Sequence, residues 1–95
     1  MPTVHLPAAL APYADGRRHL TVPLPPAAAT VGALLTAIGS AHPGVRQRVL
    51  DDQGHLRPHV NVFVGGESIR HLEGLATPVG PADEVWIIPA VSGGT

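Results

Sequence analysis

The sequence predicts an α+β fold, a roll in which a mixed sheet of about five strands packs on one main helix. Three observations support this prediction. Short segments of alternating apolar residues, typical of half-buried strands, occur on both sides of one helical stretch. That stretch has apolar residues along one side, and a sheet with one apolar face can bury them. Finally, 95 residues suffice for one small domain with a single core.

The chain begins with a predicted hairpin. Residues 3–6 and 18–22 both alternate between apolar and polar side chains. Asp15-Gly16 supplies a turn between them, because both residue types tolerate the backbone conformations of tight turns. The side chains expected to face the core are those of Val4, Leu6, Leu20 and Val22.

A helix is predicted after Thr30, whose hydroxyl is suited to cap the first helical turn. Four apolar residues follow at the spacing i, i+3, i+4 and i+7, which places them on one side of a helix. They are Val31, Leu34, Leu35 and Ile38. Pro43-Gly44 is expected to end this helix shortly before it, and residues 45–50 are expected to add one helical turn.

Three strands are predicted in the second half of the chain. Residues 60–64 are strongly β-prone, Gly65-Gly66 supplies a two-residue turn, and residues 67–70 return. Residues 71–82 are irregular, and the last strand covers residues 83–88 in the centre of the sheet. The irregular segment is expected to fill the core with Leu72, Leu75 and Val79.

The end of the chain is predicted to be a tail. We expect one folded domain over residues 1–91 and a flexible tail over residues 92–95. Ser92, Gly93 and Gly94 have small side chains or none, so they bury little surface and lose much entropy when ordered. A core strand followed by such a tail can present a backbone carboxylate to an enzyme. The alternative is an inert, frayed end, as many chains have.

Composition and charge exclude several classes of function. The net charge is −1 with His neutral, and the longest basic run is Arg17-Arg18, which argues against nucleic acid and anionic membranes as main partners. No apolar run reaches the length of a membrane span, and the N-terminus lacks a signal-peptide pattern, so a cytoplasmic protein is expected. The absence of Cys excludes disulfides and a thiol nucleophile.

No catalytic or metal-binding motif stands out. His55 and His59 are four residues apart, but Pro58 between them argues against a helix that would bring them together. No serine lies in a G-x-S-x-G motif, and neither a phosphate-binding loop nor a dinucleotide-binding motif occurs. We therefore predict that the protein is not an enzyme and binds no metal.

Three large apolar side chains are predicted on the outer face of the sheet, away from the helix. Trp86 and Ile88 alternate with inward-facing residues of the last strand, and Phe63 does the same on its own strand. Exposed side chains of this kind would dock a partner protein. The alternative is a small second cluster packed under a loop.

Charged residues in the second half of the chain are further candidates for contacts with a partner protein. Arg70, and the acidic pair Asp83 and Glu84 that is expected beside the tail, would steer a partner by their charge. The alternative is that all three are solvated surface charges.

Four segments, taken together and in order, resemble the ThiS/MoaD family of sulfur-carrier proteins. They are residues 56–64, 69–70, 74–78 and 83–94. The resemblance covers nearly the whole chain in the order of elements and the second half in residues. It is nearest to the CysO-type branch, which carries sulfur for cysteine synthesis in actinobacteria. It implies a β-grasp, ubiquitin-like fold.

The resemblance also implies a chemistry for the tail. An E1-like enzyme would use ATP to adenylate the carboxylate of Gly94, and a sulfur donor would convert the acyl-adenylate to a thiocarboxylate. A sulfur-acceptor synthase would then take the sulfur. The carrier would be a co-substrate without a bound cofactor. Gly93 and Gly94 suit this role because a residue without a side chain passes through a closed adenylation site.

Thr95 departs from the pattern of mature carriers, which end at the second Gly. While Thr95 is attached, the carbonyl of Gly94 is part of an amide and cannot be adenylated. The resemblance therefore implies that a protease removes Thr95, and a JAMM-type metalloprotease is the expected agent.

Three other functions remain open from the sequence. Two keep the fold: the small subunit of molybdopterin synthase, and a ubiquitin-like modifier joined to lysine residues of other proteins. The third is a plain interaction domain with an inert tail.

Overall fold

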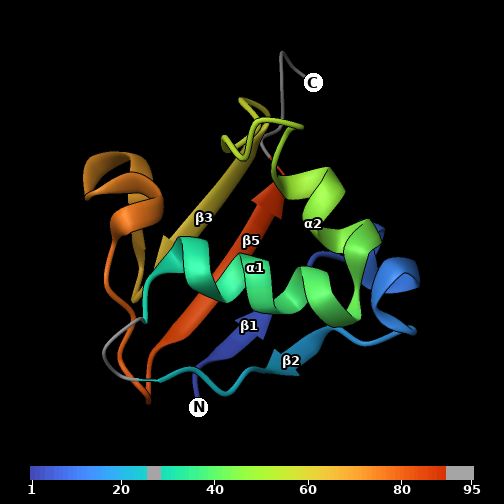
Figure 1. Cartoon of the computed structure of the whole chain (residues 1–95), viewed down its shortest axis with the longest axis horizontal. Coiled ribbons are helices and arrows are strands. Elements are labelled where there is room, and N and C mark those ends of the chain that lie inside the picture. The colour runs from blue at the N-terminus through green and yellow to red at the C-terminus, as the bar shows by residue number, and fades with distance from the viewer. Residues whose placement is uncertain (26–28, 90–95) are drawn as a thin grey trace.

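The computed structural model describes residues 1–25 and 29–89. These residues form a five-stranded mixed sheet with the helices packed on one of its faces (Figure 1). The strands are β1 (Thr3–His5), β2 (His19–Thr21), β3 (Val60–Val64), β4 (Glu67–Ser68) and β5 (Glu84–Pro89). Their order in the sheet is β2-β1-β5-β3-β4. The predicted α+β class is confirmed.

The last strand lies in the centre of the sheet, as predicted. β5 runs parallel to β1, with Val4 opposite Val85, and antiparallel to β3, with Val62 opposite Ile87. β1 also pairs with β2 in the predicted antiparallel hairpin. β1 pairs with Glu84 to Trp86, and β3 pairs with β5 as far as Pro89, so β3 alone holds the end of the central strand.

The core lies between the sheet and α1 (Val31–Ala41). The strands contribute inward-facing side chains that are at most 8% exposed, namely Val4, Leu20, Val62, Val85 and Ile87. The helix contributes the four apolar residues that its sequence spacing predicts, all at most 2% exposed: Val31, Leu34, Leu35 and Ile38. The periodicities of 2 and 3.6 residues therefore identified both sides of the core.

Thr30 caps α1 as its sequence position predicts. Its backbone is extended, and its Oγ1 accepts a hydrogen bond from the amide of Ala33 at 3.1 Å. This bond satisfies one of the amides that have no partner inside the first helical turn.

Replacing Thr30 by alanine is expected to lower the free energy of unfolding by about 1 kcal/mol, because the amide of Ala33 loses its acceptor. Urea denaturation monitored by circular dichroism measures this change. Thr30→Ser keeps a hydroxyl at the same place and is expected to retain most of the stability. Equal stability of the wild type and Thr30→Ala would show that the cap contributes nothing.

A second helix, α2 (Pro43–Val49), is longer than the single turn predicted for residues 45–50. Pro43 ends α1 but also occupies the first turn of α2, where a missing amide hydrogen costs nothing. The two helices approach closely at Gly39, where an added Cβ would lie 2.5 Å from Cδ of Arg46. No helix in residues 1–25 and 29–89 is long and apolar enough to cross a membrane.

Both predicted turns use left-handed backbone conformations. Gly65 and Gly66 have φ values of 60° and 90° and join β3 to β4. Asp15 and Gly16 have φ values of 56° and 79°. They follow the 3₁₀ helix η1 (Ala8–Ala14), which fills the connection between β1 and β2.

The irregular segment before β5 contains two short 3₁₀ helices, η3 (Ile69–His71) and η4 (Gly74–Ala76). Val79 is buried and Leu75 packs against the core, as predicted. Leu72 is 45% exposed, so its predicted place in the core is wrong. The reason is that Ile69 is fully buried at the start of η3, while Leu72 follows its last residue and points outward.

Candidate functional site

The candidate site is the end of the sheet at which β5 finishes. Val60 of β3 lies opposite Pro89, so β5 is paired up to its last residue. The predicted tail residues Ser92, Gly93, Gly94 and Thr95 lie outside the described residues. The structure therefore places the base from which the tail starts.

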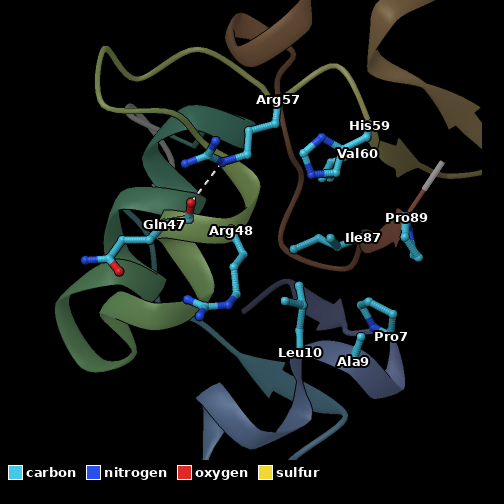
Figure 2. A pocket seen from close by; sticks show the side chains of 10 residues that line it. All are labelled: Pro7, Ala9, Leu10, Gln47, Arg48, Arg57, His59, Val60, Ile87 and Pro89. Carbon is cyan, nitrogen blue, oxygen red and sulfur yellow. Dashed lines mark hydrogen bonds between the residues drawn. The ribbon is translucent and has the colours of Figure 1, made fainter. Parts of the chain in front are cut away.

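A groove of about 480 Å³ borders this base (Figure 2). Four parts of the chain form it: η1 and the residue before it, α2, the loop that leads into β3, and the end of β5. The lining residues are Pro7, Ala9, Leu10, Gln47, Arg48, Arg57, His59, Val60, Ile87 and Pro89. The groove thus combines an apolar floor with two guanidinium groups and an imidazole.

Neutral groups hold both guanidinium groups in place. Nε of Arg57 donates a hydrogen bond to the backbone carbonyl of Gln47 at 2.9 Å (Figure 2). The guanidinium carbon of Arg48 lies 3.5 Å from the centre of the Tyr13 ring, and Nη1 of Arg48 donates to the carbonyl of Gly44 at 3.2 Å. Both cations are therefore positioned without a carboxylate partner.

The positive charge of the groove is not balanced within it. No described lining residue is acidic. In residues 1–25 and 29–89 each ion pair joins a histidine to a carboxylate, and none includes an arginine. Asp51, three positions after Arg48, is engaged elsewhere: its Oδ1 accepts from the amides of Gln53 and His55, both at 2.9 Å. These bonds, the one from His55 foremost, lower the pKa of Asp51, and the positive charge of Arg57 lowers it as well. Asp51 therefore offsets part of the charge of Arg57 from outside the groove.

The outer face of the sheet carries a row of rings. Strand register aligns them in the order His19, His5, Trp86 and Phe63. The His5 and Trp86 rings are stacked, with centroids 3.8 Å apart and planes at 7°, and Nε2 of His5 lies 2.6 Å from a carboxylate oxygen of Glu84. Trp86 is 45% exposed and Ile88 41%, which confirms their outward orientation. Their role in docking a partner stays a prediction.

The side chain of Arg70 forms hydrogen bonds with the segment that leads into β3. Its Nε donates to Oδ1 of Asn61 at 3.1 Å, and its Nη2 donates to the carbonyls of Val60 at 2.7 Å and Arg57 at 3.0 Å. This side chain has a structural function close to the groove. Its steering role stays a prediction.

The acidic pair Asp83 and Glu84 lies at the opposite end of β5 from Pro89, the last described residue before the predicted tail, and not at the end where the sequence prediction expects it. β5 is extended, so its first and last residues are roughly 17 Å apart at about 3.3 Å per residue. Glu84 begins the strand and contacts His5, whereas the tail follows Pro89 at the other end. Asp83 closes a turn by accepting a hydrogen bond from the amide of Gly80 at 2.7 Å.

Sequence reasoning missed the groove residues Arg48 and Arg57. They come from separate segments, and only the position of α2 brings them together. His59, considered above for metal binding, lines the groove, while His55 lies 4.0 Å from Asp51. In the part of the chain that the structure describes, no group of three or more His, Asp or Glu side chains could hold a metal ion.

The chain is similar in sequence to known proteins over most of its length. The sequence profile of the ThiS family matches residues 4–94. Sulfur carrier protein CysO of Mycobacterium tuberculosis (strain ATCC 25618 / H37Rv) is 33% identical over 94 residues, which cover 97% of each chain. Small archaeal modifier protein 1 of Haloferax volcanii is 46% identical over 66 residues, which cover 70% of this chain and 71% of the relative.

Solved structures agree in fold. The crystal structure of Mycobacterium tuberculosis CysO has a TM-score of 0.86 at 31% identity and covers 96% of this chain and 100% of its own. A chain in the crystal structure of the Amycolatopsis orientalis BexX/CysO complex has a TM-score of 0.87 at 30% identity, with 99% and 100% covered. The predicted β-grasp, ubiquitin-like fold is confirmed.

Proposed function

Because this chain belongs to the ThiS family of sulfur carriers, we propose that it carries sulfur as a thiocarboxylate on Gly94. The observation that carries the proposal is the extent of the family match, which runs through the whole fold to residue 94. The proposal is also supported by the 33% identity to a sulfur carrier protein, which extends over 97% of this chain.

The proposed reaction sequence begins with hydrolysis. A JAMM-type metalloprotease adds water across the Gly94–Thr95 peptide bond and releases threonine and a free Gly94 carboxylate. An E1-like enzyme then joins this carboxylate to the α-phosphate of ATP, and pyrophosphate leaves. Sulfide released by a sulfur donor attacks the acyl carbon, the bond to the AMP oxygen breaks so that AMP leaves, and a thiocarboxylate remains. A sulfur-acceptor synthase finally takes the sulfur into a biosynthetic product, cysteine or another sulfur-containing metabolite.

In this chemistry the folded domain presents the C-terminal tail to the partner enzymes. The chain itself acts as a co-substrate of these enzymes in the cytoplasm, and ATP and the sulfur donor belong to the activating enzyme. β5 fixes the base of the tail in the centre of the sheet. Trp86, Phe63 and Ile88 on the outer face, with Arg70 at the entrance to β3, are the proposed contacts for the partner enzymes.

A ubiquitin-like protein modifier is the second candidate. The 46% identity to a small archaeal modifier protein favours it. In that case the activated Gly94 is joined to lysine residues of target proteins. Adducts that migrate more slowly in cell extracts, and that disappear on deletion of Gly94, distinguish this function from sulfur transfer.

The intact mass of the protein, isolated from its native host under sulfur starvation, tests the first candidate. We expect a species that lacks the mass of Thr95 and that carries sulfur in place of one oxygen. Fragmentation should place the sulfur on Gly94. If only the unmodified mass is found, even after addition of the host's E1-like enzyme, ATP and a sulfur donor, the carrier function fails.

A further inference from the structure

The groove beside Pro89 is suited to an acidic and apolar ligand. Its floor contains Leu10, Val60 and Ile87, and its cations are Arg48 and Arg57. A ligand that fills it therefore needs an apolar side chain for the floor and carboxylates for the guanidinium groups. His59 offers a further hydrogen-bond donor at the rim.

Arg48 and Arg57 are held in place before any ligand binds, which favours pairing with a carboxylate. An arginine with a free side chain loses conformational entropy when it binds a carboxylate, which weakens the pair. Here that cost is reduced before binding, since Arg57 is fixed to the carbonyl of Gln47, and Arg48 is fixed to the Tyr13 ring and the carbonyl of Gly44. These contacts are neutral, and no acidic residue lines the groove, so both guanidinium groups can still pair with a carboxylate of a ligand.

The position of the groove indicates the ligand. Pro89 is both a lining residue and the last residue of β5. An enzyme that takes the C-terminus into its active site approaches the chain near Pro89, because the five residues after Pro89, up to Gly94, span at most about 18 Å. The adjoining groove is then within reach of that enzyme. Under the function proposed above, the enzyme that activates the tail approaches in this way once the protease has removed Thr95.

We propose that this groove is a docking site for a segment of the activating enzyme in which carboxylate side chains flank an apolar one. The segment places its apolar side chain on the floor formed by Leu10, Val60 and Ile87. Its carboxylates pair with Arg48 and Arg57. The site fixes the carrier on the enzyme while the tail reaches the adenylation centre, so it determines affinity and not the rate of the chemical step. This inference rests on the proposed carrier function.

The test is the kinetics of adenylation, followed by ATP–pyrophosphate exchange with the host's E1-like enzyme and the chain that ends at Gly94. Arg57→Glu is expected to raise the KM for the carrier about tenfold or more, because it places a carboxylate opposite a carboxylate. The kcat is expected to stay within about twofold, because the tail is unchanged. Arg48→Glu should act in the same direction, and added salt should raise the KM of the wild type more than that of Arg57→Glu.

Two variants serve as controls. Arg17→Glu makes the same change in charge at an exposed residue that does not line the groove, and its KM is expected to change by less than about twofold. Arg57→Gln removes the charge but keeps an amide that can donate to the carbonyl of Gln47, so an intermediate KM is expected. Thermal melts confirm that each variant is folded at the assay temperature.

The outcomes are distinct. If the wild type is not adenylated, the carrier function fails and the groove inference fails with it. If the wild type is adenylated but the KM of Arg57→Glu is unchanged, the carrier function stands and the docking site is refuted. The docking site is also refuted if Arg17→Glu raises the KM equally, since only net charge would then matter, or if Arg57→Glu lowers kcat alone.

Discussion

Replacing Gly94 by alanine is expected to abolish the loading of sulfur and to leave the melting temperature of the protein unchanged. Under the proposed function, a methyl group at this position would enter the adenylation site with the carboxylate, where a residue without a side chain fits. Among residues 1–25 and 29–89 the last buried core residue is Ile87, seven positions before Gly94. Loading is measured by intact mass after incubation with the E1-like enzyme, ATP and a sulfur donor.

The comparison should use chains that end at residue 94, so that the specificity of the protease does not enter the result. Ser92→Ala is a matched control, because it changes a small tail residue two positions earlier. It is expected to load sulfur. Normal loading of Gly94→Ala would contradict the proposed role of this residue. A lower melting temperature for Gly94→Ala would show that the end of the chain packs against the domain.

Replacing Leu34 by alanine is expected to reduce the free energy of unfolding by about 2–4 kcal/mol. Leu34 is fully buried between α1 and the sheet, and the truncation leaves a cavity that the surrounding side chains fill only in part. Val62→Ala, on the facing strand, is expected to destabilise the protein by a similar mechanism. The midpoint of urea denaturation measures both effects, with an unchanged m-value.

Leu72→Ala provides the matched control for Leu34→Ala. It makes the same chemical change at a leucine that is 45% exposed. Its effect is expected to stay within about 0.5 kcal/mol. If the two substitutions reduce the free energy of unfolding equally, the assignment of the core to the layer between α1 and the sheet is wrong.

Sulfur loading of Leu34→Ala below its melting temperature should match that of the wild type, because the tail is untouched.

Much of the fold could be predicted because local patterns and tertiary packing agree. The alternation of residues 60–64 and the 3.6-residue spacing after Thr30 each specify one buried face. Gly65-Gly66 fixes a turn that few other residue pairs allow. The central place of β5 was also predicted and is confirmed.

The rest depended on contacts that no local pattern encodes. Pro43 indicated the end of the first helix, but proline is also favoured in the first turn of a helix. The sequence analysis therefore missed the full length of α2. Asp83 and Glu84 are near the tail in sequence but at the opposite end of an extended strand. The groove requires Arg48 and Arg57 from separate segments. The chemistry assigned to Gly94 came from the family resemblance, and no spacing in the sequence indicated it.

The position of β5 also determines how the molecule responds to force. A pull on the C-terminus acts along β5, so the hydrogen bonds to β1 and β3 bear the strain together instead of opening one after another. An edge strand peeled from a sheet offers no such resistance. A pull along β5 therefore loads the pairing with both neighbouring strands. An unfolding machine that grips this end must rupture the middle of the sheet first.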